Sequence, residues 1–350
     1  MAIIAISISM IAFLLHAIRT EYRPKYQETL PTTLSNNNSH SINPNPSPIP
    51  LNSILSFITW NIGFGGFGCE ADFFMDGGKM SNPSRQNSLK NMEGITQCLT
   101  NQAADFILLQ EIDTQAKRSW YINQVAKITQ KLPNHQATFT PNFKVSYIPY
   151  PPNDPIGEVE SGLATISHYH ATENIRQELP GQYFWPYSMF FLKRCFLAQR
   201  FPVANGKELI VINTHKSAYD GGRFKHLQMQ VLKDTIEQEY YQGNYVVVGG
   251  DWNQCPPHFP VNTFTTANQT TVEESNIAAT FLPNWQWAYD PTQPTNRKLD
   301  TPFDTEKSAT TILDFYLLSP NIELIQVKTL DQQFAFSDHQ PVYLQIQLKD

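Results

Sequence analysis

From residue 54 onward, apolar and polar positions alternate in two patterns that together are typical of an α/β chain. Residues 84–102 place apolar side chains at helical spacing and predict an amphipathic helix. The apolar residues of its buried face are Leu89, Met92, Ile95 and Leu99. The segments ILSFITWN, at 54–61, and DFILLQEID, at 105–113, are short and rich in β-branched or large apolar residues, and they predict buried strands.

The same reasoning extends the alternation to the end of the chain. Helices are predicted at 119–132 and 222–241. Further strands are predicted at 161–169, 187–200, 207–214, 244–253, 310–318, 322–329 and 341–348. Strands that alternate with helices build layered folds whose functional residues gather just past the strand ends.

The N-terminus has a different character. Residues 2–18, AIIAISISMIAFLLHAI, are almost wholly apolar, and Arg19, Arg23 and Lys25 follow them. The run lies at the lower length limit for a membrane-spanning helix, and no positive charge precedes it. We therefore expect residues 1–18 to be an uncleaved membrane anchor, with an export signal and an ordinary buried helix as alternatives. The sequence does not indicate on which side of the membrane the downstream domain would lie.

Pro, Asn and Ser dominate the segment between this run and the first strand. The stretch PTTLSNNNSHSINPNPSPIPLN contains few residues that could be buried in a core. We expect residues 19–53 to be a disordered linker, and residues 54–350 to form one catalytic domain.

Composition and charge argue against two classes of protein. Lys and Arg number 25 and Asp and Glu 31, so the formal net charge is −6. A protein that binds nucleic acid over a broad surface through counterion release needs an excess of positive charge. An enzyme that contacts only a few phosphates does not. The 4 cysteines show no CxxC spacing, which argues against a zinc cluster. One or two disulfides stay open if the chain is exported.

Polar and ionisable residues follow the apolar strands at several points. They are Asn61, Glu111, Asn213, His215, Asp251, Asn253, Asp314, Asp338 and His339. Asp251 and Asn253 stand at i and i+2 of an extended segment, so both can address one substrate group. Glu111 ends a buried apolar strand, where a carboxylate is costly unless a positive partner meets it. Mg²⁺ is one such partner.

Each of these residues, taken alone, also fits a structural role. Glu111 can pair with an Arg or Lys, and His215 can be a hydrogen-bonded core histidine. The GDWN segment at 250–253 can be a turn with an Asx cap. The ordered set is what favours a catalytic site.

Seven motifs in order carry a resemblance to a known family. They are WNIG at 60–63, LLQE at 108–111, SGLATIS at 161–167, INTH at 212–215, GGDWN at 249–253, ILDF at 312–315 and SDHQPV at 337–342. This series resembles the endonuclease/exonuclease/phosphatase family, the DNase I-like metal-dependent phosphoesterases. The resemblance implies an α/β (α+β) fold, a four-layer sandwich of two mixed β-sheets flanked by helices.

The resemblance also implies a role for each matching residue. Asn61, Glu111 and Asp338 would hold the metal, Mg²⁺ with Mn²⁺ as the alternative. The remaining matches would form the catalytic group, which comprises His215, Asp251, Asn253, Asp314 and His339. In that group Asp251 would activate the attacking water, and His215 and Asn253 would contact the phosphate. His339, oriented by Asp314, would stabilise the transition state or protonate the leaving oxygen.

Three further residues are candidates for substrate binding. Arg194 in KRCF is a phosphate-binding candidate, against the reading of a strand-surface arginine. Lys216 stands where the family has an apolar residue and adds a positive charge beside the site. Tyr219 in the SAYDGG turn can contact substrate or pack locally.

Two loops should influence substrate choice. The Gly-rich segment 63–68 does not fit a phosphate-loop pattern and favours a mobile loop beside the site. Residues 254–309 form a long insertion that is rich in Pro, Thr and Asn. Its Trp285 and Trp287 could stack on a base or touch lipid, but anchoring of the loop is the favoured reading.

These observations support a Mg²⁺-dependent phosphoester hydrolase of the phosphodiesterase or nuclease type. The first alternative is a lipid or head-group phosphodiesterase or phosphatase, similar to the sphingomyelinase and inositol-phosphate branches. The second is a non-catalytic binding module on the same fold. The expected partners are a phosphoester substrate (nucleic acid, phospholipid or small phosphoester) and the membrane through residues 2–18. The sequence indicates no protein partner.

Overall fold

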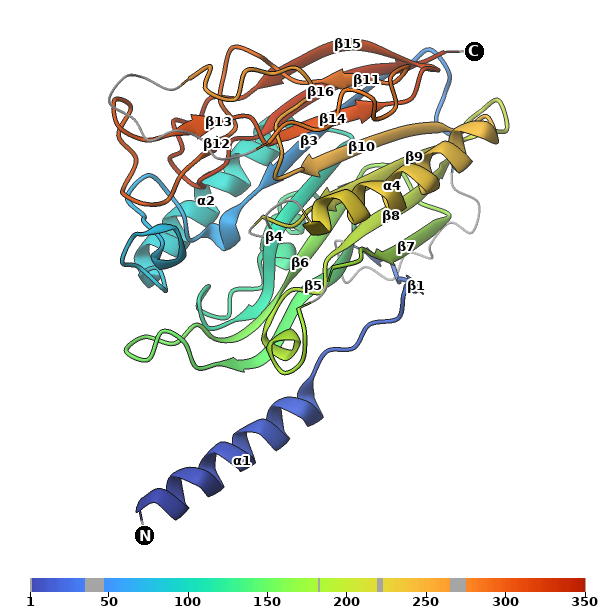
Figure 1. The fold of residues 1–350 in the computed structure, drawn as a ribbon. Coiled ribbons are helices and arrows are strands. Elements are labelled where there is room, and N and C mark those ends of the chain that lie inside the picture. The colour runs from blue at the N-terminus through green and yellow to red at the C-terminus, as the bar shows by residue number, and fades with distance from the viewer. Residues whose placement is uncertain (1, 35–46, 182, 219–222, 265–274, 350) are drawn as a thin grey trace.

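Two seven-stranded sheets stack face to face in the computed structural model, which describes residues 2–34, 47–181, 183–218, 223–264 and 275–349 (Figure 1). The first sheet has the order β1 (Gln27–Thr29), β7 (Glu173–Glu178), β8 (Cys195–Pro202), β9 (Glu208–His215), β10 (Tyr245–Asp251), β14 (Asp314–Leu318) and β11 (Gln286–Ala288). The second has the order β15 (Ile322–Thr329), β16 (Val342–Leu348), β3 (Ile54–Asn61), β4 (Phe106–Ala116), β6 (Gly157–Ser167), β5 (Gln136–Ile148) and β2 (Thr33–Leu34). A small ladder pairs β12 (Asn296–Arg297) with β13 (Thr310–Thr311).

Both sheets are mixed. The pairs β9–β10 and β3–β4 are parallel. The other ladders of the two sheets within the described residues, among them β10–β14 and β4–β6, are antiparallel. The parallel pairs lie in the middle of their sheets, so their carboxyl ends open on one edge of the sandwich.

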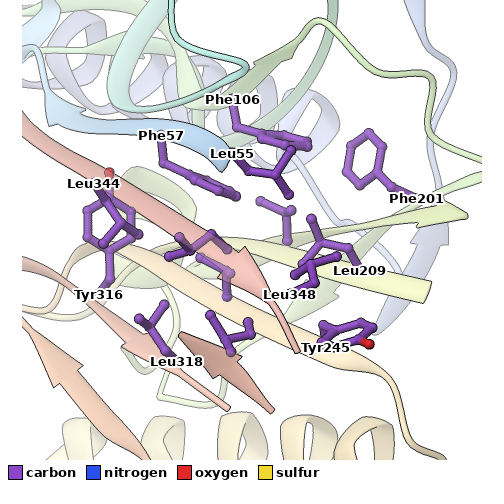
Figure 2. Close-up of a cluster of buried hydrophobic side chains, with 14 of the residues drawn as sticks. Leu55, Phe57, Phe106, Phe201, Leu209, Tyr245, Tyr316, Leu318, Leu344 and Leu348 are labelled. Atoms are coloured by element: carbon purple, nitrogen blue, oxygen red, sulfur yellow. The ribbon is translucent and has the colours of Figure 1, made fainter. Parts of the chain in front are cut away.

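The main core lies between the two sheets, where alternate residues of the strands face inward. Figure 2 shows side chains of both sheets meeting there, among them Phe57 and Phe106 of the second sheet and Leu209 and Tyr316 of the first. The rings of Phe57 and Phe106 stack with centroids 4.6 Å apart. Each fully buried side chain of this kind contributes about 1.5–3 kcal/mol through removal of apolar surface from water.

Helices cover the outer faces of both sheets. The outer face of the second sheet is covered by α2 (Arg85–Gln102) and α3 (Gln124–Thr129), through contacts such as those of Met92 and Ile95 with Ile58 and Leu109. The first sheet is covered by α4 (Arg223–Tyr241). Within the described part of the chain, three short 3₁₀ turns complete the elements: η1 (Gly63–Gly65), η2 (Phe74–Asp76) and η3 (Tyr187–Phe190). This helix–sheet–sheet–helix layering confirms the predicted four-layer sandwich.

The local predictions differ from the structure mainly where tertiary contacts intervene. The predicted strand at 54–61 matches β3, and α2 begins directly after its cap Ser84, whose side chain accepts from the Asn87 amide. The predicted helix at 119–132 shrinks to α3. Trp120 and Tyr121 adopt positive φ angles of 59° and 56°, which no right-handed helix accommodates.

The N-terminal helix α1 (Ala2–Thr20) packs its last turns against the domain. Phe13 stacks on Phe190 of η3 at a centroid distance of 5.8 Å, and the Thr20 hydroxyl lies 2.8 Å from that of Ser146 in β5. Among the described residues, no helix combines the length and the apolar character needed to cross a membrane. The expectation of a transmembrane helix is therefore wrong, and so is the membrane-anchored or exported localisation that was based on this segment.

Parts of the expected linker take part in the sheets. The strand β1 pairs with β7, and β2 pairs with β5. Ile49 is fully buried and bridges to Val203. This differs from the expectation that residues 19–53 are disordered throughout, because edge strands β7 and β5 offer free backbone groups that even a polar segment can satisfy. Residues 35–46 lie outside the described ranges.

Candidate active site

The topology brings the strand-end residues together at one edge of the sandwich. His215 ends β9, Asp251 ends β10 and Asp314 begins β14. Asp251 stands opposite His215 in the parallel ladder and opposite Asp314 in the antiparallel one. Asn61 ends β3 of the other sheet, and its amide nitrogen reaches Asp251 Oδ2 at 2.9 Å. Residues separated by up to 253 positions of the chain thus share one small volume.

A glycine allows this close approach of strands at the site. Gly250 adopts φ +152°, and a Cβ atom there would lie 1.9 Å from the carbonyl oxygen of Thr214. Any side chain at this position would push β10 away from β9. The second glycine of the GGDWN motif therefore holds Asp251 beside His215.

Two of the expected site residues adopt left-handed backbone conformations. Glu111 has φ 50° and lies at an irregularity in the pairing of β4 with β6, between Gln110 and Ile112. Asn253 has φ 48°, and its backbone N–H donates to Asp251 Oδ1 at 2.9 Å. Such conformations cost on the order of 1–3 kcal/mol each and cluster at functional sites. The irregularity at Glu111 turns its side chain away from the regular strand alternation.

His339 is oriented by a buried carboxylate. Its Nδ1 lies 2.7 Å from Asp314 Oδ2, and its Nε2 lies 3.8 Å from Asp251 Oδ2 and 3.9 Å from Asp338 Oδ2. Burial alone would lower the pKa of His339, but the three carboxylates outweigh it and raise that pKa well above its ordinary value. The imidazole is therefore suited to hold a proton at Nε2 and to donate it.

Asp251 lies at the centre of the group. Besides the Asn61 amide, His215 Nε2 lies 3.4 Å from its Oδ2. Burial alone would raise the pKa of Asp251, but His339 and His215 together with the hydrogen bonds from Asn61 and Asn253 bring that pKa below its usual value. The carboxylate stays ionised at neutral pH and is available as a proton acceptor.

His215 is held in the neutral state. Burial, with a further contribution from the positive charge of Arg194, lowers the pKa of His215 to about 3. Its Nε2 faces Asp251 and also lies 3.9 Å from Glu111 Oε1, while its Nδ1 has no hydrogen-bond partner among the described residues. A neutral imidazole whose Nε2–H faces carboxylates can donate a hydrogen bond but supplies no charge.

The expected metal ligands form an oxygen-rich corner. The Asn61 amide nitrogen lies 3.3 Å from Glu111 Oε1, and the Asn61 oxygen accepts from the Gly63 amide at 3.0 Å. Burial, reinforced by the negative charge of Glu111, raises the pKa of Asp338 to about 7. Within the described ranges neither carboxylate forms an ion pair with an Arg or Lys. Two like charges without such a partner form a donor set that suits a hard divalent cation.

A second group could also hold a metal ion by proximity. Ligand atoms of Asp251, Asp314 and His339 all lie within 4.8 Å of one another. The hydrogen bond between Asp314 and His339 Nδ1 already accounts for the closeness of that pair. A metal bound there would displace this bond, so the corner of Glu111 and Asp338 is the better donor set.

The three expected substrate-binding residues have different positions. Arg194 lies beside the site, with Nη1 3.5 Å from the His215 carbonyl oxygen. The Lys216 ammonium is fully buried away from the group, 2.7 Å from the Met229 sulfur and 5.0 Å from the centre of the Trp252 ring. The structure thus does not bring that ammonium to the phosphate position. Tyr219 lies outside the described residues.

The position of Lys216 predicts a pH-dependent stability. Burial lowers the pKa of Lys216 from its ordinary 10.5 to about 7. Between these values the unfolded chain binds more protons, so stability rises with pH by up to about 1.4 kcal/mol per unit. Lys216→Met should therefore increase the free energy of unfolding by roughly 1–3 kcal/mol more at pH 7 than at pH 9.5, as measured by urea denaturation. An equal gain in the free energy of unfolding at the two pH values would contradict the burial of Lys216. Lys131→Met, at an exposed position, is the control.

Sequence reasoning missed the segment 295–297, which reaches the site from the long insertion. The Thr295 hydroxyl accepts from the Leu313 and Asp314 amides at 2.9 and 3.0 Å. The Asn296 side-chain nitrogen lies 3.0 Å from His339 Nε2. The only signal in the sequence was the length of the insertion.

The third residue of that segment holds the Gly-rich loop. Arg297 is buried, and its guanidinium donates to the carbonyls of Gly68 and Ala71 at 2.8 and 3.1 Å. Phe64 and Phe67 of the loop are buried against each other, with ring centroids 4.6 Å apart. The loop is thus packed beside the site, in contrast to the mobile loop expected. Trp285 and Trp287 pack against Tyr240 and Trp252, as the anchoring interpretation predicts.

Comparisons with known proteins agree with the fold. The model of the endonuclease/exonuclease/phosphatase family matches residues 58–339. The fold is similar to that of the endonuclease/exonuclease/phosphatase from Beutenbergia cavernae DSM 12333, with 16% identity, a TM-score of 0.55, and coverage of 85% of this chain and 72% of that one. It is similar to the human Nocturnin catalytic domain with bound sulfate anion, with 18% identity, a TM-score of 0.55, and coverage of 87% and 98%. It is also similar to D. rerio TDP2 complexed with single strand DNA product, with 14% identity, a TM-score of 0.52, and coverage of 84% and 99%.

No curated protein matches this chain. The family match spans most of the chain and includes the candidate site from Asn61 to His339. Hydrolysis of phosphoester bonds is the chemistry of this family. The chain therefore belongs to the endonuclease/exonuclease/phosphatase family and is an enzyme of the phosphoester hydrolase class.

Proposed function

We propose that this enzyme is a Mg²⁺-dependent phosphodiesterase that cleaves its substrate by in-line attack of water. The observation that carries the proposal is the position of the Asp251 carboxylate. It lies 3.4 Å from His215, 3.8 Å from His339 and 2.9 Å from the Asn61 amide, at the end of a strand. A carboxylate with a lowered pKa beside a histidine with a raised one supplies a base and an acid within one site.

The chain's own residues divide the proton transfers between them. Asp251 takes a proton from the attacking water, and His339 gives the proton on Nε2 to the leaving oxygen. Asp314 holds the opposite nitrogen of that ring at 2.7 Å and so keeps Nε2 directed into the site. The neutral His215 donates a hydrogen bond to a phosphoryl oxygen. Asn253 fixes the Asp251 carboxylate through its backbone N–H.

Positive charge for the phosphate comes from few sources. Arg194 lies beside His215, with Nη1 3.5 Å from the His215 carbonyl oxygen. Burial lowers the pKa of Arg194, and the negative charges of Glu111 and Asp251 act against this. Glu111 and Asp338 would hold the divalent metal, with Asn61 as the third ligand after its side-chain amide turns to present oxygen. Mg²⁺ at this position would neutralise charge on the phosphoryl oxygens, with Mn²⁺ as the alternative ion.

The substrate class is supported by the charge of the chain and by two neighbours of the fold. The net charge of −6 disfavours a long duplex, which needs extensive positive surface. Of the similar structures, the human Nocturnin catalytic domain has a bound sulfate anion, and D. rerio TDP2 is complexed with a single strand DNA product. A small phosphodiester or a short single strand fits these observations best.

A substrate panel tests the proposal. The purified chain should hydrolyse bis(p-nitrophenyl) phosphate in the presence of Mg²⁺, and it should cleave a short single-stranded oligonucleotide faster than plasmid duplex. Sphingomyelin and inositol phosphates complete the panel and represent the lipid and head-group alternative. Absence of hydrolysis of every member with both Mg²⁺ and Mn²⁺ would overturn the proposal and favour a binding module.

A further inference from the structure

The side chain of Asn296 lies beside Nε2 of His339. His339 Nδ1 is taken by Asp314, and Asp251 and Asp338 lie 3.8 and 3.9 Å from Nε2. The Asn296 amide nitrogen is closer, at 3.0 Å. Any oxygen that accepts a proton from Nε2 must therefore approach within reach of this amide.

The backbone around Asn296 is fixed with respect to His339 from both sides. The Arg297 amide donates to the Asp338 carbonyl at 3.0 Å, and the Gln340 amide donates to the Thr295 carbonyl at 2.7 Å. Asn296 and His339 form an antiparallel bridge between these two hydrogen bonds. The side chain thus reaches Nε2 from a rigid position, which is the arrangement that a preorganised contact requires.

An amide suits this position because it carries both a donor and an acceptor. Its nitrogen and oxygen ends have nearly the same shape, so either can face the histidine. Asn296 is half-buried, so part of the residue stays accessible to solvent. When an oxygen of the substrate takes the place next to Nε2, the Asn296 NH₂ can donate to that oxygen.

We propose that Asn296 is a substrate-contacting catalytic residue that donates to the oxygen addressed by His339. This inference rests on the proposed phosphodiesterase function and names a further residue of the same site. A donor aimed at an oxygen on which charge develops stabilises the transition state more than the ground state. No new bond or cofactor is involved; the proton still passes from His339 Nε2 to the leaving oxygen.

Two variants and a series of leaving groups test this proposal. Asn296→Ala should lower kcat about 10- to 100-fold with little change in KM, because a hydrogen bond to a charging oxygen is lost. Asn296→Asp keeps the shape but places a negative charge next to the phosphate, so its loss should be larger. Gln293→Ala, three residues earlier on the same segment, is the matched control.

The leaving-group series separates a catalytic contact from a structural one. If Asn296 serves the leaving oxygen, the loss in Asn296→Ala should be larger for methyl phenyl phosphate, whose phenolate is a poor leaving group, than for methyl p-nitrophenyl phosphate, whose p-nitrophenolate is a good one. An equal loss for all esters, at unchanged Tm, would show that Asn296 does not serve the leaving oxygen and would overturn the inference.

Two further results would overturn the inference about Asn296 without affecting the proposed function. The first is wild-type kcat and KM in both variants, while Asp251→Asn is inactive. The second is a loss of kcat in Asn296→Ala that comes with a lowered Tm and is at least as large as the loss in Asn296→Asp. This pattern indicates a structural role. If the wild-type chain hydrolyses no phosphoester at all, the proposed function itself fails, and that result is visible before any variant is made.

Discussion

Replacing Asp251 with asparagine should lower kcat about 10²- to 10⁴-fold while the fold stays intact. The amide keeps the size of the carboxylate and can still contact Asn61 and His215, but it cannot accept a proton from water. It also removes the negative charge that faces His339 Nε2 at 3.8 Å. Steady-state kinetics on bis(p-nitrophenyl) phosphate measure the loss, and circular dichroism with thermal unfolding measures the fold.

The matched control is Asp234→Asn on the exposed face of α4, which should keep wild-type kinetics. A variant at Asp251 that retains more than about a tenth of the wild-type kcat would show that this carboxylate is not the base, given the contribution usual for such a group. In that case Glu111, whose Oε1 lies 3.9 Å from His215 Nε2, becomes the next candidate for the base that activates water.

Removal of divalent metal should abolish turnover, and Mg²⁺ should restore it. Burial, together with the negative charge of Glu111, raises the pKa of Asp338 to about 7, and a bound cation would favour the ionised carboxylate. Glu111→Gln keeps the shape of the side chain but removes one negative ligand. We expect it to raise the Mg²⁺ concentration for half-maximal rate roughly 10- to 100-fold.

Two measurements check this prediction independently. EDTA dialysis followed by Mg²⁺ titration gives the activity, and the rise of Tm with Mg²⁺ gives binding without turnover. Glu93→Gln, on the exposed surface of α2, is the control and should titrate as the wild type does. Full activity in EDTA, or equal Mg²⁺ titrations for Glu111→Gln and wild type, would contradict the placement of the metal.

Much of the site could be predicted from local sequence because its residues follow apolar strands. Asn61, His215 and Asp251 each end a strand whose pattern is unmistakable, and parallel neighbours place such ends on one edge. His339 and Asp314 were paired only through the family resemblance, and the structure places them 2.7 Å apart. The predictions failed where local pattern carries no information about neighbours, as for the last turns of α1 against β5 and η3.

Lys216 and Asn296 show this limit most clearly. Lys216 follows His215 directly, yet its ammonium lies against Met229 and Trp252, because the backbone past the strand end directs successive side chains to opposite sides. Asn296 stands in a long polar insertion with no periodicity. Its position depends on the bridge to His339 and on the backbone hydrogen bonds on either side of it.

The sequence by itself determined the chemistry available to this protein and the order of the elements that carry it. Strand periodicity, the GGDWN turn and the acidic and histidine residues at strand ends are local properties, and local steric and hydrophobic preferences are sufficient to specify them. The tertiary structure decided which groups meet. It set the protonation preferences of His215 and His339, the burial of Lys216 and the contact of Asn296, because these depend on distances between segments that are remote in the chain.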